Sequence, residues 1–185
     1  MSPPPASDMN STTASNDKLK SSAFRVGLGD VTPNNLGQLK RLNTVLFPVT
    51  YTVSFYKDVL EVGEFAKIIY FNDICVGGVC CRKEQTPGST SSQDLYIATL
   101  GVLAPYRRLG LGSKLLDHIL EHAQLPPTTG PKISKVYLHV QKHNKEALDF
   151  YEKRGFKAVE EFPNYYPQLE ETGALKLEKV LLGDD

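Results

Sequence analysis

The segment from residue 95 to residue 122 joins an apolar run to an amphipathic helix through a turn that contains glycine. The run Leu95–Leu103 has the character of a strand, and Ser113–His122 places four apolar side chains on one helical face. The residues between them include Arg107-Arg108-Leu109-Gly110-Leu111-Gly112. Glycine lets the backbone approach a ligand closely, and the first N–H groups of a helix have no partner within it. The sequence therefore predicts a strand, a turn and a helix N-terminus that together bind an anion such as a pyrophosphate.

Two other phosphate-binding patterns and one purely structural role compete with this interpretation. A P-loop requires Gly-x-x-x-x-Gly-Lys-Ser/Thr, which the chain lacks. A dinucleotide-binding fingerprint requires Gly-x-Gly-x-x-Gly early in a parallel unit. Gly110 and Gly112 could also serve only to end a strand and pack a helix. The complete Arg-x-x-Gly-x-Gly spacing, directly before an amphipathic helix, favours the anion site.

The remaining hydrophobic pattern predicts an α/β (α+β) fold, in which helices flank a central mixed, mostly antiparallel sheet. Leucines recur at helical spacing between residues 36 and 46, with Thr32 as the expected N-cap and Pro33 as the first helical residue. The other expected elements are a helix at 52–60, strands at 24–28, 66–71, 74–81, 135–140, 156–161 and 174–182, a helix at 144–154 that ends at Gly155, and loops at 84–93 and 124–133. Residues 23–183 are expected to form one domain, and residues 1–22 a disordered tail.

Charge and cysteine content limit the class of protein. Lys and Arg total 21 and Asp and Glu total 21, so neither direct nucleic-acid binding nor membrane binding is expected. The spacing of Cys75, Cys80 and Cys81 in an apolar run suits neither a disulfide framework nor a zinc site, so buried free thiols are expected. The sequence shows no secretory signal and no apolar stretch near the ~20 residues that span a bilayer. We therefore expect a cytoplasmic protein, with the nucleus as a second location.

A second segment, from Asn144 to Phe156, supports the anion site. It carries the pattern Asn-x-x-Ala-x-x-Phe-Tyr-x-x-x-Gly-Phe. Together with Arg-x-x-Gly-x-Gly, this pattern resembles the GNAT superfamily of acyltransferases. The resemblance implies that acetyl-CoA is the cosubstrate and that Tyr151 protonates the departing thiolate. The implied coenzyme A contacts are Leu100, Val102, Arg107, Arg108, Leu109, Gly110, Leu111, Gly112, Ser113, Asn144 and Tyr151.

Further segments resemble the catalytic subunits of the N-terminal acetyltransferase E complex, in the same order along the chain. They are Phe47-Pro48-Val49-Thr50-Tyr51, Phe55-Tyr56-Lys57-Asp58-Val59-Leu60, Tyr70-Phe71-Asn72-Asp73-Ile74, Leu95-Tyr96-Ile97-Ala98-Thr99-Leu100, Tyr137-Leu138-His139-Val140 and Asn164-Tyr165-Tyr166. That family acetylates the α-amino group of nascent chains, preferring methionine followed by a hydrophobic residue. The resemblance also implies association with the N-terminal acetyltransferase A complex on the ribosome.

The same resemblance assigns roles to individual residues. Tyr96 and His139 match the catalytic pair, although each alone would be more typical of a packed core residue. The positions matched to peptide binding are Phe47, Pro48, Val49, Tyr51, Tyr96, Ala98, Tyr165, Tyr166 and Leu169. Animal members carry methionine where this chain has Ala98, which shares a face of the strand with Tyr96. Alanine implies a roomier pocket for the first residue of the peptide.

Acetyl transfer to an amine makes modest demands on the base. A chain's α-amino group has a pKa of about 7.7–8.0, so part of it is neutral near pH 7. His139 suits the role of base, and Tyr96 is expected to hold a water that relays the proton to it. A backbone N–H near Leu100 or Val102 is expected to stabilise the charge on the thioester oxygen. No covalent enzyme intermediate and no metal is expected, and the histidines at 118, 122 and 143 are expected to be solvated.

Two other functions remain open for the same fold. One is acetylation of a lysine or a small-molecule amine, and the other is a non-catalytic or weakly active subunit that anchors a ribosomal acetyltransferase complex. An uncharged pocket that includes Phe47, Pro48 and Val49 favours a hydrophobic N-terminus as the substrate. The intact cofactor motif, with Tyr96 and His139, favours an active enzyme.

Overall fold

One seven-stranded sheet organises the protein. The computed structural model describes residues 24–127 and 130–181, so the tail expected at 1–22 lies outside the described residues. The strands lie in the order β1-β2-β3-β4-β5-β7-β6, and only β4 and β5 are parallel neighbours. This arrangement confirms the predicted α/β fold with a mixed, mostly antiparallel sheet. The strands are β1 Val26–Asp30, β2 Ala66–Phe71, β3 Ile74–Gln85, β4 Ser92–Val102, β5 Lys132–Gln141, β6 Lys157–Phe162 and β7 Ala174–Val180.

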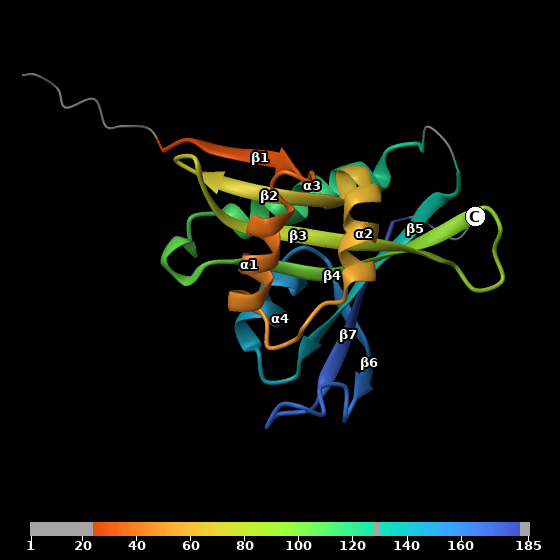
Figure 1. Cartoon of the computed structure of the whole chain (residues 1–185). Coiled ribbons are helices and arrows are strands. Elements are labelled where there is room, and N and C mark those ends of the chain that lie inside the picture. The colour runs from red at the N-terminus through yellow and green to blue at the C-terminus, as the bar shows by residue number, and fades with distance from the viewer. Residues whose placement is uncertain (1–23, 128–129, 182–185) are drawn as a thin grey trace, which may run out of the picture.

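Helices cover both faces of the sheet (Figure 1). α1 (Leu36–Leu46) and α2 (Val53–Glu61) lie on one face, where a small core gathers around Ile68 of β2. α3 (Leu111–Gln124) and α4 (Lys145–Glu152) lie on the other face, over a larger core that includes the next residue of β2, Ile69. Successive side chains of a strand point to opposite faces, so β2 and β3 contribute to both cores, whereas the buried residues of β4 and β5 in these cores belong to the larger one. Two 3-10 helices, η1 (Gly63–Phe65) and η2 (Ala104–Tyr106), precede β2 and follow β4.

The sheet opens between its two parallel strands. β4 and β5 pair from Ser92 opposite Lys132 to Tyr96 opposite Tyr137, and no pairing follows beyond that point. A bulge in β4 lies just there, because Cys80 faces Thr99 while Cys81 faces Ile97, which leaves Ala98 as the extra residue. A bulge bends its strand and increases the local twist. The carboxyl-terminal half of β4 therefore diverges from β5 and leaves a gap within the sheet.

The predicted start of the helix after the glycines is wrong by two residues. α3 begins at Leu111 rather than Ser113, with Gly110 as its N-cap in the left-handed conformation (φ 77°). Glycine adopts this conformation without steric cost, so the chain can turn sharply and enter the helix one residue later. Leu111, Gly112 and Ser113 thus belong to the first helical turn, which brings their N–H groups to the helix end.

Several other boundaries differ from the sequence prediction by one to three residues, and two of the differences have a clear physical reason. α1 has Asn35 rather than Thr32 as its N-cap, because the Asn35 side chain accepts the Thr32 N–H (2.8 Å) and donates to the Asp30 carbonyl (2.8 Å), which closes a turn before the helix. The loop expected at residues 84–93 is shorter, since β3 runs to Gln85 and β4 starts at Ser92. These polar residues pair as strands at an exposed end of the sheet, where no hydrophobic alternation marks them.

Other predicted features are confirmed. The helix expected at 52–60 is α2, and Thr52 caps it by accepting the Phe55 N–H (3.2 Å). Gly155 (φ 81°) ends α4 in a Schellman arrangement, in which the Phe156 N–H reaches the Tyr151 carbonyl (3.2 Å). Cys80 and Cys81 are buried free thiols, whereas Cys75 is only partly buried. Within the described ranges, no helix combines the length and apolar character needed to cross a membrane.

Candidate active site

A cleft of about 710 Å³ runs through the gap between β4 and β5, from the α1–α2 connection to α4. Most of the residues that the sequence assigns to substrate or cofactor binding line it. They are Phe47, Pro48, Val49, Tyr51, Ala98, Leu100, Val102, Arg107, Arg108, Gly110, Leu111, Gly112, Ser113, His139, Asn144, Tyr151, Tyr166 and Leu169. Segments that are far apart in the sequence therefore form one continuous surface.

Three helical N–H groups form the anion-binding end of the cleft. The first intrahelical bond of α3 runs from the Lys114 N–H to the Gly110 carbonyl (3.0 Å), so the N–H groups of Leu111, Gly112 and Ser113 have no partner within the helix. The positive end of the helix dipole adds to their attraction for an anion. This geometry fits a pyrophosphate, as the sequence motif predicts.

The two arginines of the motif have different surroundings. Arg107 donates from Nε to the Val102 carbonyl (3.0 Å), which ties the turn to the end of β4. Arg108 adopts a left-handed conformation (φ 64°) and forms an ion pair with Glu146 of α4 (3.2 Å). The turn leaves the Leu109 side chain 52% exposed and outside the cleft lining. Only its backbone can contribute there.

Arg154 is a site residue that the sequence motifs do not reveal. Its guanidinium donates to the Ser113 hydroxyl and, through Nη1, to the Phe150 carbonyl (3.0 Å). It also stacks over the Phe150 ring, with Cζ 4.1 Å from the centroid. Arg154 thereby fixes α4 against the first turn of α3. Its position is variable in the helix pattern, so the sequence offers no separate signal for this contact.

The α4 residues also have defined surroundings. Asn144 caps α4 by accepting the Ala147 N–H on Oδ1 (3.1 Å), so part of its amide serves the helix rather than a ligand. Tyr151 is 5% exposed, yet it borders the cleft. Burial raises the pKa of its hydroxyl well above the usual range. Tyr151 therefore stays protonated at neutral pH and can donate a hydrogen bond to a departing sulfur, although its raised pKa makes it a weaker acid than an ordinary tyrosine.

The opened edge of β4 presents backbone donors to the cleft. The Leu103 N–H donates to the Val76 carbonyl of β3 (2.8 Å), whereas the Val102 carbonyl accepts Arg107 on the other side. Neighbouring residues of a strand direct their peptide groups to opposite edges. The N–H groups of Val102 and Leu100 therefore point into the gap, where they can stabilise an oxyanion.

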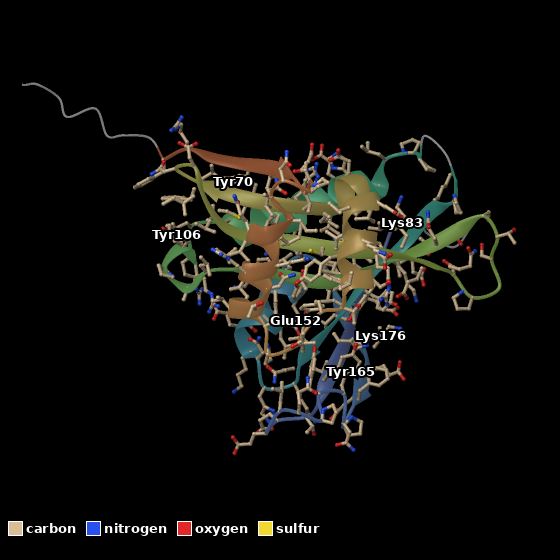
Figure 2. All side chains as sticks on the ribbon, in the orientation of Figure 1. Tyr70, Lys83, Tyr106, Glu152, Tyr165 and Lys176 are labelled. Atoms are coloured by element: carbon tan, nitrogen blue, oxygen red, sulfur yellow. The ribbon has the colours of Figure 1, made fainter. Side chains whose placement is uncertain are left out.

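A tyrosine hydroxyl joins the two catalytic candidates. The Tyr165 hydroxyl lies 3.3 Å from the Tyr96 hydroxyl and 3.1 Å from Nδ1 of His139. The Tyr165 ring stacks on the imidazole, with centroids 4.2 Å apart and an angle of 18°. Figure 2 labels Tyr165 near the lower end of β7. The relay that we expected through a water can thus run from one hydroxyl to the next and on to His139.

Burial sets the protonation states of this group. It raises the pKa of Tyr96 far above the usual range, and the bond with Tyr165 raises it further. The pKa of His139 is lowered, first by burial and then by the positive charge of Lys176, while Glu84 opposes the shift. His139 is therefore neutral near pH 7 and can accept a proton, whereas Tyr96 cannot act as the base.

A charged network supports Tyr96 from the side away from the cleft. The Tyr137 hydroxyl and the Arg82 guanidinium both donate to the Glu84 carboxylate. Arg82 lies over the Tyr96 ring, with Cζ 5.3 Å from the centroid, and the Tyr96 and Tyr137 rings are 5.0 Å apart. These contacts hold the Tyr96 ring in place.

The other end of the cleft is apolar and aromatic. Phe47 and Tyr51 meet edge to face at 6.3 Å on the α1–α2 connection, while Tyr165 and Tyr166 meet similarly at 4.8 Å on the β6–β7 loop. Ala98 borders the cleft between these two loops, and burial raises the pKa of Tyr166 to about 12. All of these side chains are uncharged at neutral pH, so this end suits a hydrophobic chain.

Comparison with known proteins gives consistent matches. The model of the Acetyltransferase (GNAT) family matches residues 37–156. The chain is 54% identical to N-alpha-acetyltransferase 50 of Danio rerio over 85% of this chain and 89% of that protein. It is 48% identical to the probable N-acetyltransferase san of Drosophila melanogaster over 84% of this chain and 81% of that protein.

A solved structure matches both the fold and the sequence. The structure of Arabidopsis thaliana Naa50 in complex with the bisubstrate analogue CoA-Ac-MVNAL has a TM-score of 0.75 and 44% identity, and the match covers 83% of this chain and 97% of that one. The family match extends from α1 to the end of α4, and it includes the opened strands and the first turn of α3. The chain therefore belongs to the GNAT family of acetyltransferases.

Proposed function

We propose that this protein transfers the acetyl group of acetyl-CoA to the α-amino group of peptides that begin with methionine and a hydrophobic residue. The Tyr96–Tyr165–His139 chain of contacts carries this proposal. His139 lines the cleft, and Tyr165 and Tyr96 lie behind it in the chain of contacts, outside the cleft lining. The similarity to N-alpha-acetyltransferase 50, and to a Naa50 whose analogue contains MVNAL, supports the choice of substrate.

The cosubstrate fits the other end of the cleft. Acetyl-CoA supplies the activated acetyl group when it is bound. The three free N–H groups at the start of α3 can hold its pyrophosphate, and the gap between β4 and β5 can admit its pantetheine arm. Val102 and Leu100 then offer N–H groups where charge develops on the thioester oxygen. Preorganised donors of this kind stabilise the transition state because they need little reorganisation.

The proton leaves the attacking amine by a short route. The nitrogen attacks the thioester carbon as a neutral amine, and its excess proton passes to the Tyr96 hydroxyl, then to Tyr165 and then to Nδ1 of His139. Each hydroxyl donates one proton as it receives another, so only His139 changes charge. The Tyr151 hydroxyl can donate a hydrogen bond to the departing thiolate at the other side of the cleft. His139 releases its extra proton to solvent, which balances the proton that the thiolate takes up. No covalent bond to the enzyme forms.

Acetylation of lysine or of a small amine is the competing function. A polyamine needs acidic groups for its second charge, and the residues at the apolar end, including Phe47, Val49 and Tyr166, provide none. Among the residues that the structure describes, two acidic side chains border the cleft, Glu146 and Asp149, and both lie on α4. This distribution favours an uncharged residue after the α-amino group.

The partner and the location follow from the sequence. We propose that the protein associates with subunits of the N-terminal acetyltransferase A complex on cytoplasmic ribosomes and that a second pool lies in the nucleus. The support for the partner is the family resemblance of the segments quoted from the sequence, and the support for the location is the absence of a secretory signal from them. Co-purification of the tagged full chain with ribosomes and with those subunits tests it, and a chain found only free of both would contradict it.

A peptide panel tests the proposed substrate. Peptides that differ only in their first two residues are incubated with acetyl-CoA, and turnover is compared for wild type and His139→Ala. We expect the highest kcat/KM for methionine followed by a hydrophobic residue, and a loss of about 10²–10⁴ in kcat for the variant. Equal turnover across the panel would contradict the substrate, and wild-type turnover of the variant would remove His139 from the mechanism.

A further inference from the structure

Two histidines that the sequence suggests are solvated gather with a glutamate on the face away from α1 and α2. His118 and His122 lie one turn apart on α3, and Glu64 comes from η1. Their side-chain ligand atoms all lie within 4.8 Å of one another. We call these three residues the His118–His122–Glu64 cluster. Residues i and i+4 of a helix share one face, so the pair presents two imidazoles to the same point.

The distances in this cluster approach those of a metal site. Glu64 Oε2 lies 3.1 Å from His118 Nε2 and 3.6 Å from His122 Nε2. Ligands bound tetrahedrally to zinc at about 2.0–2.1 Å are separated by about 3.3–3.4 Å, which falls between these two values. The imidazole rings have centroids 4.0 Å apart. Small side-chain rotations would therefore bring all three ligand atoms to bonding distance.

The surroundings of His122 favour a ligand rather than a simple surface residue. Its Nδ1 lies 2.8 Å from the His118 carbonyl, so the proton belongs on Nδ1 and Nε2 keeps its lone pair. Metal-bound histidines usually donate their second ring N–H in this way. Nε2 of His118 contacts both the carbonyl and the carboxylate of Glu64 and must shift its proton to Nδ1 before it binds a metal.

The charges around the cluster leave room for a cation. The buried Lys67 ammonium pairs with Asp30 and with Glu64 Oε2 (2.7 Å). One ammonium and two carboxylates sum to a charge of −1. Lys67 can keep Asp30 while Glu64, whose side chain is 52% exposed, turns one oxygen towards a metal. A bound divalent ion would raise this sum to +1. The five side chains around this charge are His118, His122, Glu64, Lys67 and Asp30.

We propose that the His118–His122–Glu64 cluster binds one divalent transition metal ion, with two imidazole nitrogens, one carboxylate oxygen and water as ligands. This donor set suits zinc among the common cations, since imidazole and carboxylate are both frequent zinc ligands. The ion would join η1 to α3 and act on stability. His118 lies seven residues beyond Leu111, about 10 Å along the helix axis, so acetyl transfer would not depend on the metal.

A metal titration of the purified full chain, with its affinity tag removed, tests this proposal. Zinc and, separately, cobalt are titrated into the metal-free protein, and bound metal, the visible cobalt spectrum and Tm are recorded. We expect one equivalent to bind, a cobalt spectrum typical of a tetrahedral site, and a rise in Tm that EDTA reverses. Peptide turnover should be the same with and without zinc. A failure to bind zinc can therefore be distinguished from a failure of the proposed acetyl transfer, because the two are measured separately.

Matched variants locate the site. His122→Gln and Glu64→Gln should weaken zinc binding by about tenfold or more, because even the loss of an outer contact costs 10–100-fold. His143→Gln, which changes an exposed histidine paired with Glu171, serves as the control and should bind zinc as wild type does. Failure of the wild type to bind zinc would overturn the proposal. Unchanged binding in His122→Gln, with native circular dichroism, would also overturn it, because the metal would then lie elsewhere.

Discussion

At the scale of single residues, the proposed proton route depends on hydrogen bonds among the side chains of Tyr96, Tyr165 and His139. The resemblance places Tyr96, His139 and Tyr165 in one site, but it assigns Tyr165 to the peptide. The structure gives Tyr165 a second role, because its hydroxyl lies within 3.3 Å of both catalytic candidates. No spacing rule could predict this contact, since Tyr165 lies 26 residues from His139 in a loop without regular structure. The His118–His122–Glu64 cluster escaped prediction for the same reason, because Glu64 lies 54 residues before His118.

Removal of the Tyr165 hydroxyl tests the relay. We expect Tyr165→Phe to lower kcat by about thirtyfold, because two hydrogen bonds of about 1 kcal/mol each are lost along the proton route. Tyr166→Phe is the matched control, since its hydroxyl makes neither contact with the catalytic pair. Steady-state turnover of one Met-Val peptide measures both variants. Equal losses in the two variants would mean that Tyr165 acts only through packing.

The charge of Lys176 should set the acid limb of the pH profile. Lys176 faces His139 across the β5–β7 pair and lowers its pKa, so the base stays neutral to lower pH than an ordinary imidazole would. As pH falls, protonation of His139 removes the base and kcat declines. We expect Lys176→Gln to move this decline to higher pH, and Lys135→Gln, the control on β5, to leave it in place. A profile of kcat at saturating peptide measures the shift, and an unmoved limb in Lys176→Gln contradicts the assignment of His139.

Ala98 should tune the first-residue pocket. It is the extra residue of the β4 bulge and borders the apolar end of the cleft. A methionine side chain there would fill space that a substrate side chain can otherwise occupy. We expect Ala98→Met to narrow the range of accepted first residues and to lower kcat/KM for the bulkiest ones by about tenfold, as loss of 1–3 kcal/mol in a hydrophobic pocket predicts. Competition between peptides with different first residues measures this, and an unchanged ranking would place the pocket elsewhere.

At the scale of elements, prediction succeeds where hydrophobic pattern and capping chemistry agree. The β2 strand is predicted with its observed ends because apolar residues fill it and a tight turn at Asn72-Asp73 follows. The outer ends of β3 and β4 are missed because they are polar, and only their partners in the sheet hold them extended. The start of α3 is predicted two residues too late because glycine is compatible both with a loop turn and with the first turn of a helix. That error matters, since it decides which N–H groups face the cleft.

Gly112 tests the helix end directly. As the second residue of α3, it donates no intrahelical bond, so Gly112→Pro deletes one free N–H without breaking the ladder. Gly112→Ala keeps the N–H, and its Cβ would meet only the Phe150 ring at 3.7 Å, an ordinary contact. We expect the proline variant to bind coenzyme A about tenfold more weakly or worse, and the alanine variant to bind nearly as wild type.

Calorimetry measures both affinities. Circular dichroism and Tm must accompany it, because proline also disfavours the helical conformation of the preceding Leu111. A natively folded proline variant with unaltered affinity would contradict the proposed role of these N–H groups.

At the scale of the whole molecule, each of the two hydrophobic cores supports one end of the cleft. The sheet opens between β4 and β5, where the cleft runs. The larger core fixes α3 and α4, and the smaller one fixes α1 and α2, which carry the loop at the peptide end. The order of elements predicts the mixed sheet, but not the position of its opening. That position depends on the bulge at Ala98, where the pairing of β4 with β3 shifts by one residue. The hydrophobic pattern of the sequence does not indicate this shift.

The proposed function is acetylation of an α-amino group and not of a side-chain amine. A peptide that begins Met-Val and carries one internal lysine offers both amines to the same enzyme. After incubation with acetyl-CoA, tandem mass spectrometry assigns the acetyl group to one nitrogen. The geometry predicts acetylation of the α-nitrogen at least a hundredfold faster than that of the lysine, a difference of about 2.7 kcal/mol. Preferential acetylation of the lysine, or equal rates at both nitrogens, would contradict the account.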